Sequence, residues 1–333
     1  MKAVFFAEHG GIDKLTWGDF PTPVPGSGET RVRVKACGLN RLDLLLRQGT
    51  PGLPVPLPHV LGADVAGTTD DGRRVMVAPG LSCGACPACA TDRDHLCDRF
   101  DILGQNTNGG YAQFVVVPDR NLLPLPDTIP FEAAAAFPLV FMTAWHALVS
   151  LADLTRGETA LIHAGGSGVG TAAIQIARER GARVMTTVGA PWKKDRAIAL
   201  GAEEAVVRTE EDWATAAARW TEGRGVDVVL DTVGQTTFAT DLQCLRRGGR
   251  LVACGSTSGR EASFDLRSLF GKNITVFGTR LGPRRALEDV FALFKSGQFK
   301  PVVDRVFPLA QAAAAQSHLQ QNKSFGKVVL TTE

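Results

Sequence analysis

Four of the seven cysteines in this 333-residue chain lie within residues 83–97 and have the spacing C-x2-C-x2-C-x7-C. Glycine and proline between them favour tight turns, so four thiolates can surround one tetrahedral zinc ion. Four cysteine ligands leave no open coordination position, which predicts one structural zinc per chain, held by Cys83, Cys86, Cys89 and Cys97. The alternatives are an iron–sulfur cluster, a redox thiol array and a nucleic-acid zinc ribbon, although residues 91–95 carry no basic stripe.

A second candidate for chemistry is the glycine-rich segment 164–170, which reads A-G-G-S-G-V-G. It follows a predicted strand at 160–163 and precedes a predicted helix at 170–180. Glycines at such a turn let a pyrophosphate approach the start of a helix, where unpaired N–H groups and the helix dipole favour an anion. The alternative is a merely glycine-rich turn. The pattern predicts dinucleotide binding by Gly165, Ser167, Gly168, Val169 and Gly170, with serine in place of the usual middle glycine.

The end of the next predicted strand, 184–188, indicates which dinucleotide binds. A site selective for NAD usually places Asp or Glu there for the ribose 2′-hydroxyl, but residues 187–194 read T-V-G-A-P-W-K-K. Lys193, and Arg208 after the third predicted strand, can instead offer positive charge to a 2′-phosphate. We therefore predict NADPH in preference to NADH, the alternative being that these are ordinary solvated charges.

The elements that must position these residues fall into two domains of an α/β protein. Residues 1–122 alternate short β-rich runs with turns, at 2–6, 30–36, 75–78 and 112–117, which predicts a mostly β domain. Further along, helical stretches alternate with apolar runs, which predicts a six-stranded, doubly wound Rossmann domain with strands at 160–163, 184–188, 205–207, 226–230, 250–254 and 274–277. A helix at 284–295, a segment at 302–307 and a strand at 327–330 should return to the first domain. The predicted domains are 1–122 with 280–333, including the zinc lobe at 83–97, and 123–279.

Composition excludes several classes of protein. The chain has 36 Lys+Arg against 34 Asp+Glu and 44% hydrophobic residues, which gives no electrostatic footprint for nucleic acid or an anionic membrane surface. No apolar stretch approaches the length of a membrane helix, and residues 1–9 lack the features of a signal peptide. We expect a cytoplasmic protein that acts on a small molecule, with neither nucleic acid nor membrane as a partner.

Several segments resemble the medium-chain dehydrogenase/reductase superfamily, which includes zinc alcohol dehydrogenases and quinone reductases. They are C-G-L-N-R-L-D at 37–43, L-G-A-D-V-A-G at 61–67, G-Y-A at 110–112, residues 139–145, the glycine loop and the four cysteines. The resemblance covers essentially the whole chain. It implies a chaperonin-10-like catalytic domain, an active site between domains, hydride transfer with a nicotinamide cofactor, and a homodimer paired through the strand at 274–277.

The resemblance also implies that the catalytic metal site of zinc alcohol dehydrogenases is incomplete here. Its three ligands fall at Cys37, at Ala63 and near Leu139, so only the cysteine is retained. An open catalytic zinc normally needs three protein ligands. The alternative is that His59 replaces the missing histidine, alongside Cys37 and a carboxylate such as Asp43 or Asp64.

Resemblance to the metal-free quinone reductase branch implies roles for other residues. Asn40 would lie beside the cofactor and Thr143 beside the nicotinamide, while Lys193 and Arg208 would bind the 2′-phosphate. Asp43 and His59 are the nearest polar candidates for a catalytic role in orienting substrate. The branch's usual tyrosine falls at Leu45, and Tyr111 is expected to pack at the start of a strand, so no proton donor is evident.

The leading hypothesis is an NADPH-dependent oxidoreductase that transfers hydride to a quinone, an enone or an activated carbonyl. A zinc-dependent alcohol dehydrogenase with a second, catalytic zinc is the alternative within the same class. An alternative of another class is a nonenzymatic dinucleotide-binding sensor.

Overall fold

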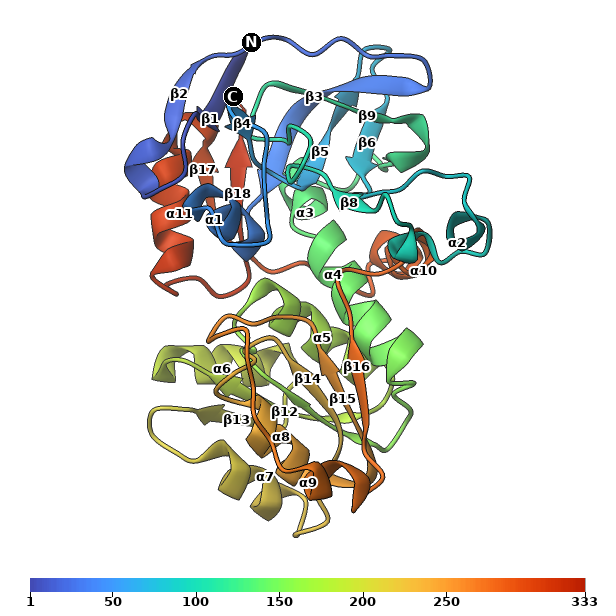
Figure 1. Ribbon diagram of the computed structural model, residues 1–333, viewed down its shortest axis with the longest axis vertical. Helices are drawn as coiled ribbons and strands as arrows, with labels where there is room; N and C mark the ends of the chain where they lie inside the picture. Colours follow the sequence, from blue (N-terminus) through green and yellow to red (C-terminus); the bar gives the residue numbers. More distant parts are fainter. Residues whose placement is uncertain (333) are drawn as a thin grey trace. The chain divides into compact units, whose positions relative to one another are not determined.

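The computed structural model describes residues 1–332 and divides the chain into two compact units (Figure 1). Unit 1 consists of Met1–Leu139 and Pro283–Glu333, and unit 2 of Val140–Gly282. The first boundary lies inside helix α4 (Pro138–Trp145) rather than after residue 122. The reason is local, because β10 (Leu122–Pro124) pairs with β6 (Arg74–Val77) and α3 (Phe131–Ala135) packs against β3 (Glu29–Gly38).

Unit 1 is mostly β-structure. Its main sheet has the strand order β10-β6-β5-β3-β18-β17, with β9 also paired to β3, and smaller sheets are formed by β2-β1-β4 and β7-β8. The remaining strand bounds are β1 (Lys2–Phe6), β2 (Thr16–Asp19), β4 (His59–Val60), β5 (Asp64–Thr69), β7 (Gly80–Leu81), β8 (Asp101–Ile102), β9 (Phe114–Pro118), β17 (Val303–Pro308) and β18 (Lys327–Thr331). The predicted return of the C-terminal segment is confirmed, since β18 runs antiparallel to β3 with Leu330 opposite Cys37.

Helices and 3-10 turns connect these strands in unit 1. They are α1 (Arg41–Gln48), α2 (Pro87–Ala90), α10 (Arg284–Lys295) and α11 (Ala312–Gln320), with 3-10 turns η1 (Ile12–Lys14), η2 (Asp94–Leu96), η3 (Asp119–Asn121) and η5 (Leu309–Gln311). One apolar core joins β1, β3, β5, β6, β9 and β18 through fully buried residues such as Phe6, Val34 and Val328. Removing this apolar surface from water is the main force that fixes the register of the strands.

Unit 2 contains the predicted six-stranded parallel sheet. The strand order is β13-β12-β11-β14-β15-β16. Successive strands are added on one side of β11 as far as β13 and on its other side from β14 onward, as in a doubly wound dinucleotide fold. The strands are β11 (Thr159–Ile162), β12 (Arg183–Val188), β13 (Glu204–Val207), β14 (Val226–Asp231), β15 (Leu245–Ala253) and β16 (Thr275–Gly278). The helices are η4, a π-helix (His146–Leu151), α5 (Gly168–Glu179), α6 (Pro191–Leu200), α7 (Trp213–Trp220), α8 (Phe238–Cys244) and α9 (Leu266–Phe270). Right-handed crossovers place α5 and α6, which contact each other, on one face and the contacting pair α7 and α8 on the other.

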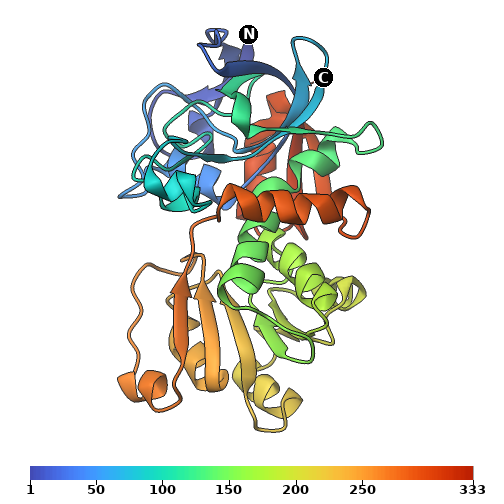
Figure 2. The ribbon, with the colours of Figure 1, turned by 90° about the vertical axis from the view of Figure 1, so that its right-hand side faces the viewer.

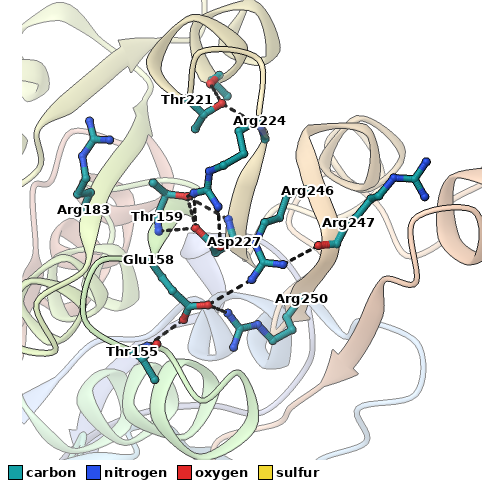
Figure 3. A network of polar contacts seen from close by, with 12 residues as sticks. Thr155, Glu158, Thr159, Arg183, Thr221, Arg224, Asp227, Arg246, Arg247 and Arg250 are labelled. Atoms are coloured by element: carbon teal, nitrogen blue, oxygen red, sulfur yellow. Dashed lines mark hydrogen bonds and ion pairs between the residues drawn. The ribbon is translucent and has the colours of Figure 1, made fainter.

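The two ends of this parallel sheet differ in polarity. At the amino ends of β11 and β14, Asp227 accepts hydrogen bonds from Arg224 and Thr159 and pairs with Arg246 (Figure 3). The carboxylate is 3% exposed, and these donors hold its pKa well below the usual range, although burial opposes them. The glycine loop lies at the opposite, carboxyl end, where ligands of such sheets bind.

Strand β16 forms one edge of the sheet (Figure 2), and its Val276 side chain is exposed. Along residues 1–332, no helix combines the length and the apolar character needed to cross a bilayer.

Candidate functional site

The four cysteines form one cluster in unit 1. Cys83 follows β7, and Cys97 is the C-cap of η2. Cys86 is the N-cap of α2, and Cys89 lies within that helix. Their sulfur atoms all lie within 4.8 Å of one another. Among the described residues, this is the only group of three or more His, Cys, Asp or Glu side chains whose ligand atoms converge in this way.

The geometry of the cluster fits a tetrahedral metal ion. The Sγ atoms of Cys83 and Cys89 are 3.8 Å apart, and those of Cys86 and Cys89 are 3.5 Å apart. A tetrahedron with zinc–sulfur bonds of about 2.3 Å has sulfur–sulfur edges of about 3.8 Å. The backbone N–H groups of Ala85 and Cys86 point at the Cys83 sulfur and lower the pKa of its thiol to about 5. Hydrogen bonds with the neighbouring sulfurs instead raise the pKa of the Cys86 thiol to about 11, so the fit to a cation rests on the convergence of the four sulfur atoms.

The junction of β3 and α1 holds the next polar group. Asn40 is the N-cap of α1, and its backbone N–H donates to the Asp43 carboxylate over 2.8 Å. The Tyr111 hydroxyl donates to the same carboxylate oxygen over 3.0 Å. Burial raises the pKa of Asp43 to about 6, although both hydrogen bonds oppose this shift. Tyr111 is fully buried, as its predicted packing role requires, and it also orients Asp43.

An ion pair that the sequence analysis did not anticipate adjoins this junction. Lys327 Nζ lies 2.8 Å from Asp64 Oδ2, and both side chains are almost completely inaccessible to water. The same ammonium donates to the Asn40 side-chain oxygen and to the Leu39 carbonyl, each over 2.7 Å. Asn40 Nδ2 donates to Asp64 over 2.9 Å, and the Leu139 N–H donates to the other Asp64 oxygen over 2.8 Å.

The alternative metal set does not converge in this structure. His59 is fully buried on β4, where its Nε2 donates to the Gly104 carbonyl over 2.9 Å and its ring lies edge-on to Phe6. Burial lowers the pKa of His59. Asp43 and His59 therefore have separate hydrogen-bond partners. Within residues 1–332, Cys37, His59 and the two carboxylates do not form a ligand cluster.

In unit 2, the glycine loop turns β11 into α5. The Ser167 hydroxyl caps α5 by accepting a hydrogen bond from the Gly170 N–H over 2.9 Å. A Cβ at Gly165 would lie 2.2 Å from the Thr186 hydroxyl, and one at Gly170 would lie 2.2 Å from the Ala164 carbonyl oxygen. Close packing therefore requires glycine at both ends of the loop. Gly168 and Val169 form the first turn of α5, so their N–H groups belong to the free helix terminus.

Basic side chains gather near the end of β12. A Cβ at Gly189 would lie 4.0 Å from Arg208 Nε, and the backbone of Arg208 bonds to the Val188 carbonyl. Arg208 makes no ion pair with any residue in the part of the chain that the structure describes. Lys193 lies in the first turn of α6, with its Nζ 5.1 Å from the centre of the Trp192 ring. Thr143 is buried in α4.

A buried histidine directly before the loop was also missed by the sequence analysis. His163 Nε2 donates to Asp241 over 2.7 Å, and its Nδ1 lies 3.0 Å from the Thr187 hydroxyl. That hydroxyl accepts a hydrogen bond from the Ala164 N–H. Burial lowers the pKa of His163, but the Asp241 carboxylate outweighs it and the net shift is upward. This network ties the start of the glycine loop to β12 and α8.

Comparisons with known proteins support the same architecture. Family models match for an alcohol dehydrogenase GroES-like domain at residues 26–127 and a zinc-binding dehydrogenase at residues 168–296. A quinone oxidoreductase of Pseudomonas aeruginosa is 31% identical over 342 residues, which cover 99% of both chains. Polyketide synthase GfsB of Streptomyces halstedii is 35% identical over 97% of this chain, which spans only 5% of that synthase. A solved NAD-dependent alcohol dehydrogenase matches the whole of both chains with a TM-score of 0.96 and 41% identity.

The chain therefore belongs to the medium-chain dehydrogenase/reductase superfamily, a family of NAD(P)H-dependent oxidoreductases. Unit 1 is its GroES-like part and unit 2 its Rossmann-like part, as the sequence analysis predicted. The names of these relatives favour an enzyme over a nonenzymatic sensor.

Proposed function

We propose that the chain is an NADPH-dependent reductase that transfers hydride to a quinone, an enone or an activated carbonyl, with one structural zinc at the four cysteines. The carrying observation is the Asp64–Lys327 ion pair at the segment where metal-dependent relatives are expected to hold a catalytic zinc. Cys37 is the one retained ligand of that site, and Ala63 stands at the place of its histidine. The reaction would therefore proceed without a Lewis-acidic metal.

The cofactor assignment is supported by the charges at the end of β12. Arg208 lies beside Gly189, and Lys193 lies in the first turn of the next helix. Together they can neutralise a 2′-phosphate, while the segment lacks the acid that would bind a 2′-hydroxyl. When bound, the nicotinamide supplies the hydride. The glycine loop would bind the pyrophosphate, and the resemblance implies that Asn40 and Thr143 lie beside the cofactor.

The test is the oxidation of NADPH by a panel of quinones, enones and aldehydes at substoichiometric protein. Steady turnover with at least one acceptor is expected, and NADH should be a poorer donor. NADPH binding without turnover across the whole panel would contradict the proposal.

A zinc-dependent alcohol dehydrogenase remains the second candidate, because the solved NAD-dependent alcohol dehydrogenase is 41% identical. It requires a second metal ion per chain and oxidation of alcohols with NAD. Elemental analysis together with an alcohol panel distinguishes the two candidates.

We also propose a homodimer that pairs through the exposed edge of β16, since an unpaired apolar edge strand is a liability. Light scattering of the purified chain should then give twice the chain mass. Val276→Lys on this edge should shift the protein toward monomers.

A further inference from the structure

Lys327 is an unusual residue for its position. It begins β18, whose next three residues are buried and apolar, and its own side chain is 4% exposed. Gly326 before it has φ +98°, and a Cβ there would lie 2.3 Å from the Val302 carbonyl oxygen. The chain is thus tightly constrained where it delivers a charged side chain into the interior of unit 1.

The hydrogen bonds of this ammonium are complete. An ammonium has three N–H donors, and the three acceptors are Asp64 Oδ2, Asn40 Oδ1 and the Leu39 carbonyl. No donor remains for a substrate. Lys327 can therefore neither protonate a product nor polarise a carbonyl directly, and any effect on the reaction must pass through the groups that it holds.

One of those groups is the Asn40 side-chain amide. Its oxygen accepts from Lys327 over 2.7 Å, and its nitrogen donates to Asp64 over 2.9 Å. A cation on one side and a carboxylate on the other allow only one of the two amide orientations. The amide nitrogen also donates to the Gly38 carbonyl over 3.5 Å, so what the amide still offers in a fixed direction is a lone pair of its oxygen.

The ligand set of a catalytic zinc does not fit this segment. Cys37 and Asp64 lie on paired strands, with Asp64 opposite Gly38, but the neighbouring position holds Ala63. Asp64 is already neutralised by the ammonium, and Leu139 contributes only a backbone N–H that bonds to Asp64. A divalent cation here would have to compete with a charge that belongs to the chain itself.

We propose that Lys327 takes the place of a catalytic metal as the fixed cation of unit 1, neutralising Asp64 and holding the Asn40 amide in the orientation that binds NADPH. Lys327 is thus a positioning residue that acts through Asn40. This inference rests on the metal-free reductase proposed above. It adds the residue that orients the Asn40 amide toward the cofactor.

The experiment compares NADPH dissociation constants, measured by protein fluorescence without turnover, in four zinc-loaded variants. They are Asn40→Ala, the pair Asp64→Asn with Lys327→Met, the triple variant that combines all three changes, and the control Lys323→Met. The pair removes both charges together, so no uncompensated carboxylate is left in the interior. Lys323 is an exposed lysine four residues before Lys327.

We expect Asn40→Ala and the charge-pair variant each to bind NADPH about tenfold more weakly, as for loss of one well-oriented hydrogen bond to the cofactor. The triple variant should bind no more weakly than Asn40→Ala, because the changes act through one group. Lys323→Met should match the unaltered protein. If the charge-pair variant does not fold, Asp64→Asn alone is compared with Asn40→Ala in the same way.

Two results would overturn the inference. One is a loss of about a hundredfold in the triple variant, which would mean that Lys327 and Asn40 act independently. The other is unaltered NADPH affinity in the charge-pair variant. A chain that shows the expected binding pattern but reduces no acceptor would instead contradict the proposed function and leave the positioning role standing.

Discussion

Unit 1 contains two places built around positive charge, and they are built in opposite ways. The cysteine cluster takes its four ligands from residues 83–97, three of them half-exposed, and these ligands would hold an external cation. The Asp64 site is buried and joins β5, the β3–α1 junction and β18, and its cation is the side chain of Lys327. In the function proposed above, the first site would hold a metal that supports the fold, and the second would need no metal.

The polar network around Asp227 in unit 2 differs from the Asp64 site because one of its partners is exposed to solvent. At the amino end of the sheet in unit 2, Arg224 pairs with Asp227 (Figure 3), but the arginine side chain is 49% exposed. Arg246 and Thr159 bind the same carboxylate, so loss of one partner leaves others in place. Ion pairs with a solvated partner contribute little, whereas breaking a buried pair leaves a charge without compensation.

The largest effect is expected from Cys86→Ser, which removes one of four ligands. The variant should lose the bound zinc, and the melting temperature should fall by about 10 °C, because zinc binding stabilises the folded lobe. The matched control is Cys244→Ser, a half-buried cysteine outside the cluster that should retain the metal. Retention of zinc by Cys86→Ser would show that the cysteine cluster is not the metal site.

Lys327→Met should cost about 3–5 kcal/mol of unfolding free energy in urea denaturation, since Asp64 is left charged and buried. Adding Asp64→Asn should recover much of this loss. If the double variant were less stable than the single one, Asp64 would not be the group that needs the lysine.

Lys193→Glu combined with Arg208→Glu reverses the two charges that are proposed to bind the 2′-phosphate of NADPH. The dissociation constant for NADPH should rise by about a hundredfold, because two charge-assisted contacts to the 2′-phosphate are replaced by repulsion. The constant for NADH should change little. An equal rise in the dissociation constants for NADPH and NADH would show that these residues do not bind the 2′-phosphate.

Tyr111→Phe tests the carboxylate next to the lysine site. Burial raises the pKa of Asp43 to about 6. The folded chain therefore loses stability as the pH rises from about 4 to about 6, because the unfolded chain releases this proton first. The Tyr111 hydroxyl opposes this by donating to the ionised group. The substitution should therefore cost about 2 kcal/mol at pH 7.5 and about 1 kcal/mol at pH 5. Equal costs at the two pH values in urea titrations would contradict this coupling.

Arg224→Met should give the smallest effect, below about 1 kcal/mol in the same titrations, because its ion pair is half-solvated. A loss as large as that of Lys327→Met would remove the distinction between the buried and solvated networks.

The sequence was most informative where the functional residues lie close together along the chain. The four cysteines and the glycine loop are local patterns, so spacing alone predicted one converging cluster and one strand–loop–helix turn. The six parallel strands followed from apolar runs whose bounds the structure reproduces within one residue, except that β15 starts at Leu245 instead of the predicted residue 250.

The lysine site could not be derived in that way, because Lys327 is 263 residues from Asp64. The two meet because β3 pairs with β18 on one side and with β5 on the other. A charged residue at the head of the apolar run V-V-L was the available signal. His163 is a similar case, since its partner Asp241 comes from a helix 78 residues away.

The most direct test of the account is the zinc content of the folded chain, measured after equilibration with a modest excess of zinc and removal of unbound metal. One zinc per chain, lost in Cys86→Ser and retained in Lys327→Met with Asp64→Asn, is the predicted result. Two zinc ions per chain, with the second lost in Cys37→Ser, would contradict the replacement of the catalytic metal by Lys327.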